Sequence, residues 1–133
     1  MLSKPFSLSK HERLKSKKQI DALFLNGKAF FVYPFKVKFM FAPAGGNPQL
    51  KFGISVPKRN FKKAVDRNRI KRLSREAYRL HKILIQEKVQ VDKFDLQTMF
   101  IYTHNEILGY EEIKKAIIKC LNKLMELVPS SNH

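Results

Sequence analysis

Hydrophobic and polar positions along the chain follow two periods, one near 3.6 residues and one of two residues. The helical period is clear at Ile20, Leu23 and Phe24, whereas Phe35-Lys36-Val37-Lys38-Phe39 alternates as a half-buried strand does. Gly, Pro and Asn separate such segments, for example at Asn26-Gly27, where a helix is expected to stop. The pattern predicts, in order, a helix over residues 15–25, one strand or two strands broken at Pro34 over 29–42, a strand over 50–56, a basic loop over 57–63, a helix over 64–86, a strand over 96–103 and a helix over 110–128.

The predicted elements fit one domain, which we place over residues 1–133, with a flexible arm at 1–8 and a flexible tail at 129–133. The chain is 44% hydrophobic and contains 11 Phe and 4 Tyr, which is enough apolar material for a packed core. The longest apolar run covers residues 29–35, whereas a helix needs about 20 apolar residues to span a bilayer. Because the first residues lead into no apolar signal segment either, we expect a cytoplasmic protein without a membrane partner.

Positive charge is concentrated in the first part of the chain. The formal net charge is +16, and residues 1–79, with 20 basic and 4 acidic residues, carry all of it. Residues 80–133 hold 7 basic and 7 acidic residues and are neutral as a group. A surface that is merely soluble rarely needs charge of one sign, so the asymmetry favours a binding face for a polyanion. Nucleic acid is the first candidate and an acidic membrane the second.

Much of this charge lies in residues 58–79, which contain ten basic and two acidic residues. On a helical projection, one face is apolar and carries Ile70, Leu73, Ala77, Leu80 and Leu84. The opposite face is cationic and carries Asn68, Lys71, Arg72, Arg75, Arg79 and Lys82, with Arg67 and Arg69 at its edges. The segment therefore predicts an amphipathic helix that packs on a sheet and presents its cations to a partner.

The first turn of this helix is electrostatically unfavourable by itself. Lys62, Lys63, Arg67 and Arg69 crowd an end where the helix dipole is already positive, and Asp66 is the acid that compensates. Each exposed cation there costs about 0.3–1 kcal/mol. Phosphate groups would offset that cost, because helix-end amides and arginine forks both bind them. We therefore predict a phosphate-binding surface; the alternative is a solvated charged face.

RNA fits this sequence better than DNA. The spacing of Cys and His matches no zinc finger, and no heptads follow the basic helix as they do in a basic leucine zipper. The Phe-rich strands supply flat apolar surfaces suited to the unstacked bases of single-stranded RNA, although most of these Phe must belong to the core.

Residues with catalytic chemistry are scarce. The single cysteine, Cys120, shares the apolar stripe of the last predicted helix, so we expect a buried hydrophobic residue rather than a nucleophile. The four histidines show no acid–base or ligand spacing; they are His11, His81, His104 and His133. The basic region has four acids; they are Glu12, Asp21, Asp66 and Glu76. We therefore predict neither catalytic nor metal-binding residues in this chain.

The first part of the basic helix resembles the Arg-Asn-Arg signature of the bacterial ribonuclease P protein component family. Its sequence is Ala64-Val65-Asp66-Arg67-Asn68-Arg69-Ile70-Lys71-Arg72-Leu73-Ser74-Arg75-Glu76. The strand and loop before this helix also resemble the family, with the sequence Phe52-Gly53-Ile54-Ser55-Val56-Pro57-Lys58-Arg59. The order of predicted elements agrees with that of the family over residues 14–127. The resemblance implies an α+β, single-domain α-β-β-β-α-β-α sandwich, in which helices pack on a central four-stranded sheet. It also implies a left-handed β-α-β crossover around the basic helix, an exception to the usual hand. A ribosomal protein domain shares this general fold.

The resemblance implies the protein subunit of a ribonucleoprotein endoribonuclease that removes the 5′ leader of precursor tRNA. The expected partners are a catalytic RNA subunit and precursor tRNA, and no obligate protein partner is implied. Catalysis is expected from the RNA, with Mg²⁺ bound mainly by the RNA and the substrate. The protein would stabilise the folded RNA, improve metal affinity and hold the leader.

Together with the charge pattern, the resemblance assigns two surfaces. The surface for the catalytic RNA comprises Lys62, Lys63, Arg67, Asn68, Arg69, Lys71, Arg72, Arg75 and Arg79. The cleft for the leader comprises Phe24, Lys58 and Arg59 at positions that match the family, with Phe35 and Lys38 as candidates on the sheet face. Many members carry two aromatics four residues apart in the first helix, and the first of these positions is Ile20 here, which offers apolar contact without stacking. Phe24 can alternatively be a core residue, since the first helix must bury something.

The concentration of positive charge is also compatible with two other classes of protein. A non-enzymatic RNA-binding protein, such as a ribosomal protein or an RNA chaperone, would co-purify with RNA other than one catalytic species. A DNA-binding architectural protein would bind duplex DNA tightly, with little preference for structured RNA.

Overall fold

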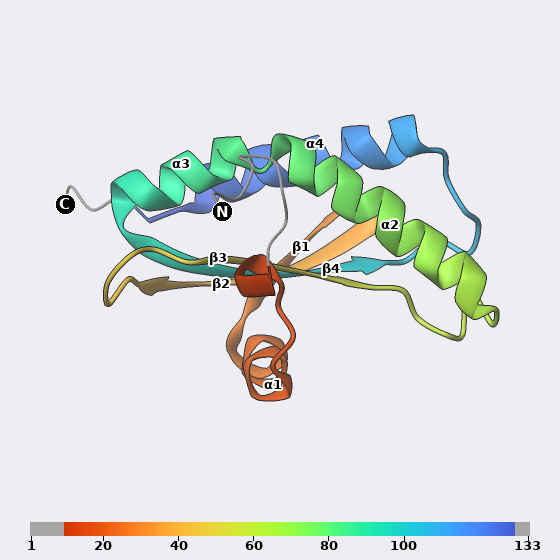
Figure 1. Ribbon diagram of the computed structural model, residues 1–133, viewed down its shortest axis with the longest axis horizontal. Helices are drawn as coiled ribbons and strands as arrows, with labels where there is room; N and C mark the ends of the chain where they lie inside the picture. Colours follow the sequence, from red (N-terminus) through yellow and green to blue (C-terminus); the bar gives the residue numbers. More distant parts are fainter. Residues whose placement is uncertain (1–9, 130–133) are drawn as a thin grey trace.

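The computed structural model describes residues 10–129, so the arm predicted at 1–8 and residues 130–133 of the predicted tail lie outside the described residues. Its elements are, in chain order, the 3-10 helix η1 (Lys10–Glu12), α1 (Lys17–Asn26), β1 (Lys28–Val32), β2 (Phe35–Pro43), β3 (Leu50–Ser55), α2 (Ala64–His81), α3 (Ile83–Asp92), β4 (Phe94–Tyr102) and α4 (Tyr110–Leu127). The α+β class is confirmed (Figure 1). The extended region over 29–42 forms two strands, which are separated at Tyr33 and Pro34 by a turn with a cis peptide bond.

One sheet holds the strands in the order β1-β2-β4-β3. Strand β2 pairs antiparallel with β1 and β4, whereas β3 pairs parallel with β4. Because parallel neighbours cannot be joined by a hairpin, the chain crosses from β3 to β4 through α2 and α3. Figure 1 shows these two helices and α4 on one face of the sheet and α1 on the other. The predicted four-stranded sheet with helices packed on it is therefore confirmed.

The main core fills the layer between the sheet and helices α2, α3 and α4. Strand β2 sends alternate side chains into it; they are Phe35, Val37 and Phe39. Tyr78 of α2 stacks on Phe52 of β3, with ring centroids 3.9 Å apart. Cys120 lies in the buried stripe of α4, as predicted.

A smaller cluster fixes α1 to the other face of the sheet. Leu23 is fully buried there and packs with Leu14 and Met99. Gly53 of β3 makes room for this cluster, because a Cβ atom at that position would lie 2.7 Å from the terminal methyl carbon of Met99. Full burial of one leucine contributes about 1.5–3 kcal/mol. Since Leu23 is the residue of α1 that is buried, most of the helix surface remains available to a partner.

The helix predicted over residues 64–86 is two helices, α2 and α3. They are separated at Lys82, although the Lys82 amide still donates to the Tyr78 carbonyl and the Gln86 amide to the Lys82 carbonyl. Helix α3 also continues beyond Gln86 to Asp92, where Lys93 ends it in the left-handed conformation with φ of 59°. The sequence carries no Gly or Pro at that stop, so its pattern gave the wrong end.

The helical projection is wrong at the C-terminal end of α2. Leu80 and Leu84, expected on the apolar face, are 38% and 45% exposed. Lys82, expected on the cationic face, is buried and forms an ion pair with Glu12. The residues that α2 does bury are Ile70, Ser74, Ala77 and Tyr78. A projection could not reveal this, because the partner of Lys82 lies 70 residues earlier in the chain.

We predict that Cys120 resists alkylation in the folded protein. Burial raises the pKa of its thiol to about 12, so at pH 8 almost none of the reactive thiolate is present. Mass spectrometry after iodoacetamide treatment should find the native protein unmodified, and one added group per chain in guanidinium chloride. Rapid modification under native conditions would contradict the placement of this residue in the core.

Candidate nucleic-acid interface

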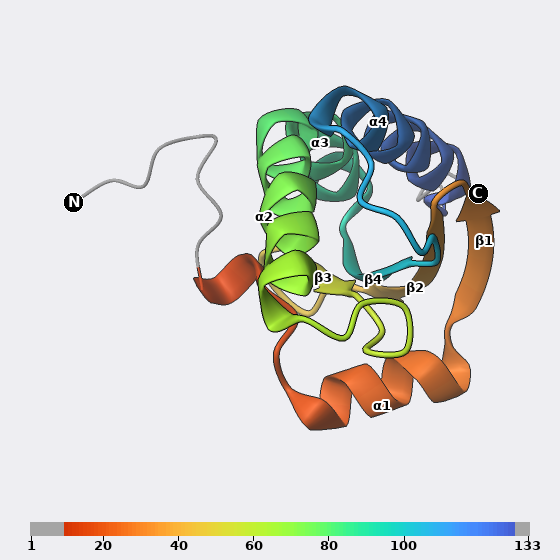
Figure 2. The same ribbon diagram turned by 90° about the vertical axis from the view of Figure 1, so that its right-hand side faces the viewer.

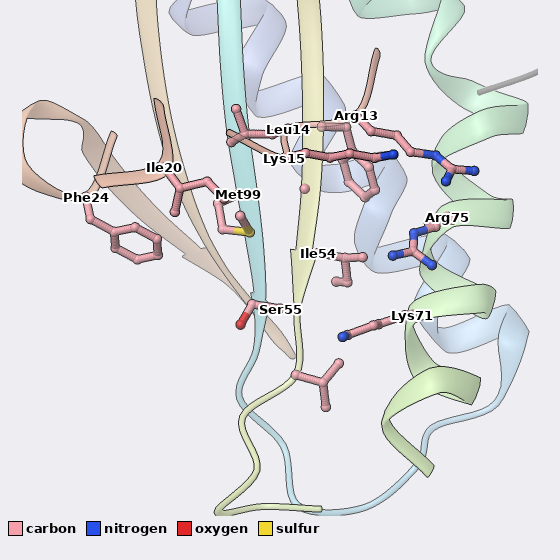
Figure 3. A pocket seen from close by; sticks show the side chains of 13 residues that line it. Arg13, Leu14, Lys15, Ile20, Phe24, Ile54, Ser55, Lys71, Arg75 and Met99 are labelled. Atoms are coloured by element: carbon pink, nitrogen blue, oxygen red, sulfur yellow. The ribbon is translucent and has the colours of Figure 1, made fainter. Parts of the chain in front are cut away.

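A cleft of about 500 Å³ opens between α1 and α2, along β3. Figure 2 shows α2 beside β3, with α1 across the sheet face that α2, α3 and α4 leave open. In Figure 3, Ile20 and Phe24 of α1 lie on one side of the cleft and Lys71 and Arg75 of α2 on the other. The edge of the sheet lies between them: Met99 and Ser55 are on the α1 side of β3, and Ile54 points toward α2.

Four basic residues form what we call the cationic wall of this cleft; they are Arg13, Lys15, Lys71 and Arg75. The segment before α1 joins the edge of the sheet, because Arg13 forms a parallel bridge with Phe52 and the Leu14 amide donates to the Phe52 carbonyl at 2.8 Å. This contact brings the wall together from two parts of the chain. Among the described residues that line the cleft, none is acidic.

The wall is electrostatically strained. Burial lowers the pKa of Arg75, and the positive charge of Arg13 lowers it further. Arginine nevertheless stays charged in proteins, so both guanidinium groups remain cations in the cleft. Desolvation and mutual repulsion therefore oppose this arrangement, and attraction to a bound polyanion would offset their cost. Arg13 and Lys15 were missed by the sequence analysis, because only the bridge to Phe52 reveals where they lie.

Phe24 is not a core residue, since 42% of its surface is exposed. The neighbouring Leu23 fills the buried position of α1 instead. Lys38 lies on the same side of the sheet, with its ammonium nitrogen 6.0 Å from the centre of the Phe24 ring. Ile20 is half-buried and lines the cleft, as expected for an apolar contact without an aromatic face.

The prediction that Phe35 faces the leader is wrong. Phe35 is fully buried in the core on the opposite side of the sheet, where its ring packs against Phe100 and Tyr102. Residues three apart on a strand point to opposite faces, so Phe35 and Lys38 could not both line one cleft. The alternation along β2 was correct, but the assignment of its faces was not consistent with it.

The remaining residues assigned to the catalytic RNA lie on α2 or just before it, but they do not all face the same way. Lys71 and Arg75 line the cleft. Arg79 contacts Glu76 through a side-chain ion pair of 2.5 Å. The exposed members of the set are Lys62, Lys63, Asn68, Arg69 and Arg72, which we call the outer basic face. The cationic surface therefore extends from the cleft around α2.

Arg67 has a structural role that the sequence did not predict. Its guanidinium donates to the Phe61 carbonyl at 2.7 Å and to the Lys62 carbonyl at 3.0 Å. These bonds hold the loop before α2 against the first turn of the helix. Lys58 and Arg59 are exposed in the turn that follows β3, next to Val56, which lines the cleft. The loop thus carries basic side chains beside one end of the cleft.

The described residues offer little for acid–base or metal chemistry. Within residues 10–129 no group of three or more His, Cys, Asp and Glu is placed to hold a metal ion. The ring nitrogen Nδ1 of His81 contacts the Ala77 carbonyl at 2.8 Å, and the His104 ring packs edge-on against Tyr33. In the same part of the chain, no helix has the length and hydropathy that crossing a membrane requires. What the cleft does combine is cations on one side and apolar side chains on the other.

Known proteins are similar to this chain in sequence and in fold. The family model Ribonuclease P matches residues 8–125. The ribonuclease P protein component of Porphyromonas gingivalis is 37% identical over 126 residues, which cover 95% of this chain and 92% of that protein. The one from Dictyoglomus thermophilum is 32% identical over 121 residues, which cover 89% and 92% of the two chains.

Two solved structures agree with the fold described above. The ribonuclease P protein of Staphylococcus aureus superimposes with a TM-score of 0.65 at 21% identity. The superposition covers 90% of this chain and 100% of the other. The one from Thermotoga maritima gives 0.64 at 23% identity, over 84% and 96% of the two chains. The family model covers most of the chain and the relatives in sequence cover nearly all of it, and the chain therefore belongs to the ribonuclease P protein family.

Proposed function

We propose that this chain is the protein subunit of ribonuclease P, and that it binds both the catalytic RNA and the single-stranded 5′ leader of precursor tRNA. In this function the holoenzyme hydrolyses one phosphodiester bond and releases the leader, which gives the mature 5′ end of the tRNA. Family membership supports the assembly with RNA, and the cleft between α1 and α2 supports the binding of the leader.

The observation that carries the proposal is the pairing of a cationic wall with an apolar side in one cleft. Single-stranded RNA presents phosphates along one side and base faces along the other. The phosphates fit the wall that includes Arg13, Lys71 and Arg75, and the bases fit the side formed by Phe24 and Ile20. Such contacts ask little of base identity, so this mode of binding tolerates many leader sequences.

The outer basic face is available to the catalytic RNA. Its arginines, Arg69 and Arg72, are exposed and can present planar forks to phosphate oxygens. Because Lys71 and Arg75 lie on the cleft side of the same helix, α2 would stand between the two RNA partners. This arrangement places the leader against the protein while the catalytic RNA contacts the other side of α2.

Mg²⁺ belongs to the RNA and the substrate in this proposal. When bound, the ion activates water and stabilises the charge that develops on the phosphate. The described residues group no ligands for it, and a cleft lined by four cations repels it. The protein would act on metal affinity indirectly, because holding the leader fixes the position of the substrate phosphates.

The second candidate, a non-enzymatic RNA-binding protein, shares the basic surface. Family membership favours the first. The two are distinguished by the RNA that co-purifies with the chain: one species of a few hundred nucleotides, or ribosomal RNA.

We predict that the purified protein does not cleave precursor tRNA, even with Mg²⁺, and that cleavage appears when the catalytic RNA of the same organism is added. The reason is that the described residues contain no group of three or more His, Cys, Asp and Glu placed to hold a metal ion. Gel analysis of the tRNA 5′ end measures both reactions. Cleavage by RNA-free protein that survives controls for contaminating nucleases would refute the assignment of catalysis to RNA.

We predict that Arg69→Ala and Arg72→Ala each weaken assembly with the catalytic RNA by about 1–3 kcal/mol, the range for a charged hydrogen bond. Lys115→Ala is the matched control, because Lys115 is exposed on α4 in the neutral part of the chain. It should change the dissociation constant little when all proteins are compared at one salt concentration. Equal losses in the three variants would show that the outer basic face is not the site.

We predict that Phe24→Leu reduces the preference of the holoenzyme for precursor tRNA over mature tRNA. Leucine keeps apolar bulk but removes the aromatic face, whose stacking is worth about 1–3 kcal/mol per base. Leu25→Ala is the control on the same helix, because Leu25 is 82% exposed and does not line the cleft. If Phe24→Leu lowers only the melting temperature, the aromatic side of the cleft does not contact the leader.

A further inference from the structure

The sheet face that carries α1 continues past the cleft to the free edge of β1. Strand pairing sets a row of side chains across it, from Ser55 on β3 to Ile101 on β4, Lys36 on β2 and Phe31 on β1. Directly paired residues lie on the same face of a sheet. Since Ser55 lines the cleft, the row begins in the cleft and ends at the outer edge of the sheet.

Helix α1 leaves the outer half of this row open. Its buried Leu23 packs with Met99 of the neighbouring row, and Ile101 packs against the same cluster. Beyond Ile101, Lys36 is exposed although β2 is an inner strand, and 58% of the Phe31 surface is exposed. An aromatic ring and an ammonium group therefore lie side by side on an open floor, in direct continuation of the cleft.

The chemistry of this row repeats that of the cleft. Phe31 lies directly opposite Lys36 in the pairing of β1 with β2, and in the cleft Lys38 lies over the Phe24 ring. An aromatic face beside a cation suits a base beside its phosphate. The row contains no acid, so a polyanion complements it better than a second copy of this chain, whose net charge is +16. The next exposed aromatic, Tyr33, does not extend the row, because its ring packs against His104 at 5.4 Å.

We propose that Phe31 and Lys36 form a further single-strand RNA position, which takes a leader nucleotide farther from the cleavage site than those in the cleft. Lys36 lies two residues from Lys38, or about 7 Å along the strand, and Phe31 is one strand further, at about 5 Å. One extended strand of RNA can cover both steps. The leader then crosses the sheet from β3 to β1. This inference rests on the proposed function, since it extends the path of the same leader.

The test uses holoenzyme reconstituted with the catalytic RNA of the same organism, and precursor tRNAs whose leaders are lengthened one nucleotide at a time. The dissociation constant of each is compared with that of mature tRNA. With Phe31→Leu, affinity should be unchanged for short leaders and about fivefold weaker once the leader reaches the β1 edge. Phe31→Tyr, which keeps the aromatic face, should restore the affinity for long leaders.

Matched variants separate this position from its surroundings. Tyr33→Leu removes an exposed aromatic outside the row and should leave the length dependence unchanged. Lys36→Ala should selectively weaken the binding of precursor tRNAs with long leaders, as Phe31→Leu should. Lys115→Ala should not weaken it. Because Lys36 is exposed and lies outside the core, its variant tests the proposal even if substitution of Phe31 disturbs folding.

The outcomes distinguish this inference from the proposed function. If Phe24→Leu reduces the leader advantage and neither Phe31→Leu nor Lys36→Ala affects long leaders, the further position is refuted while the cleft stands. If the Phe31 and Lys36 variants weaken the binding of mature tRNA and of all precursors equally, they act through another contact, and the inference is again refuted. If none of the three variants changes the leader advantage, contact of the leader with the aromatic side of the cleft is refuted together with the further position.

Discussion

The parallel pairing of β3 with β4 decides where the charge of this protein lies. A parallel pair needs a crossover, and the crossover is α2 and α3, so the most basic segment of the chain is held beside the outer strand of the sheet. The free edge of β3 then receives the segment before α1 through the bridge between Arg13 and Phe52. Cations from two distant parts of the sequence meet along one strand, and the cleft follows from that meeting.

Periodicity was sufficient for most of the elements and for much of the core, although it joined α2 and α3 into one helix and ended that helix too early. The alternation in β2 and the stripe on α4 both depend on which face is buried, and burial is what selects hydrophobic residues at those positions. Cys120 was placed correctly for this reason. The same rule exposes the error at Phe35, since alternation already separates it from Lys38. The basic surface could be predicted because charge of one sign has a cost that only a partner offsets.

Contacts between distant residues could not be predicted in this way. Lys82 can be buried because Glu12 pairs with it, and Leu80, expected on the apolar face of α2, is exposed. Arg13 lines the cleft because its backbone bridges to Phe52, which no local pattern marks. Arg67 matches the family signature, yet its guanidinium holds the loop before α2. A sequence signature identifies the residue, but only the fold shows which groups its side chain contacts.

The four acids of the basic region are placed so that they leave the positive charge of the cleft uncompensated. Glu12 pairs with the buried Lys82, and Glu76 pairs with Arg79. Asp66 lies in the first turn of α2, where a negative charge favours the positive helix end, and Asp21 is exposed on α1. None of the four lines the cleft. The field there is uncompensated, which suits the binding of phosphates and is unsuited to holding a cation. This arrangement fits the proposed function, in which the protein positions a nucleic acid and leaves the hydrolysis, and the metal that serves it, to an RNA partner.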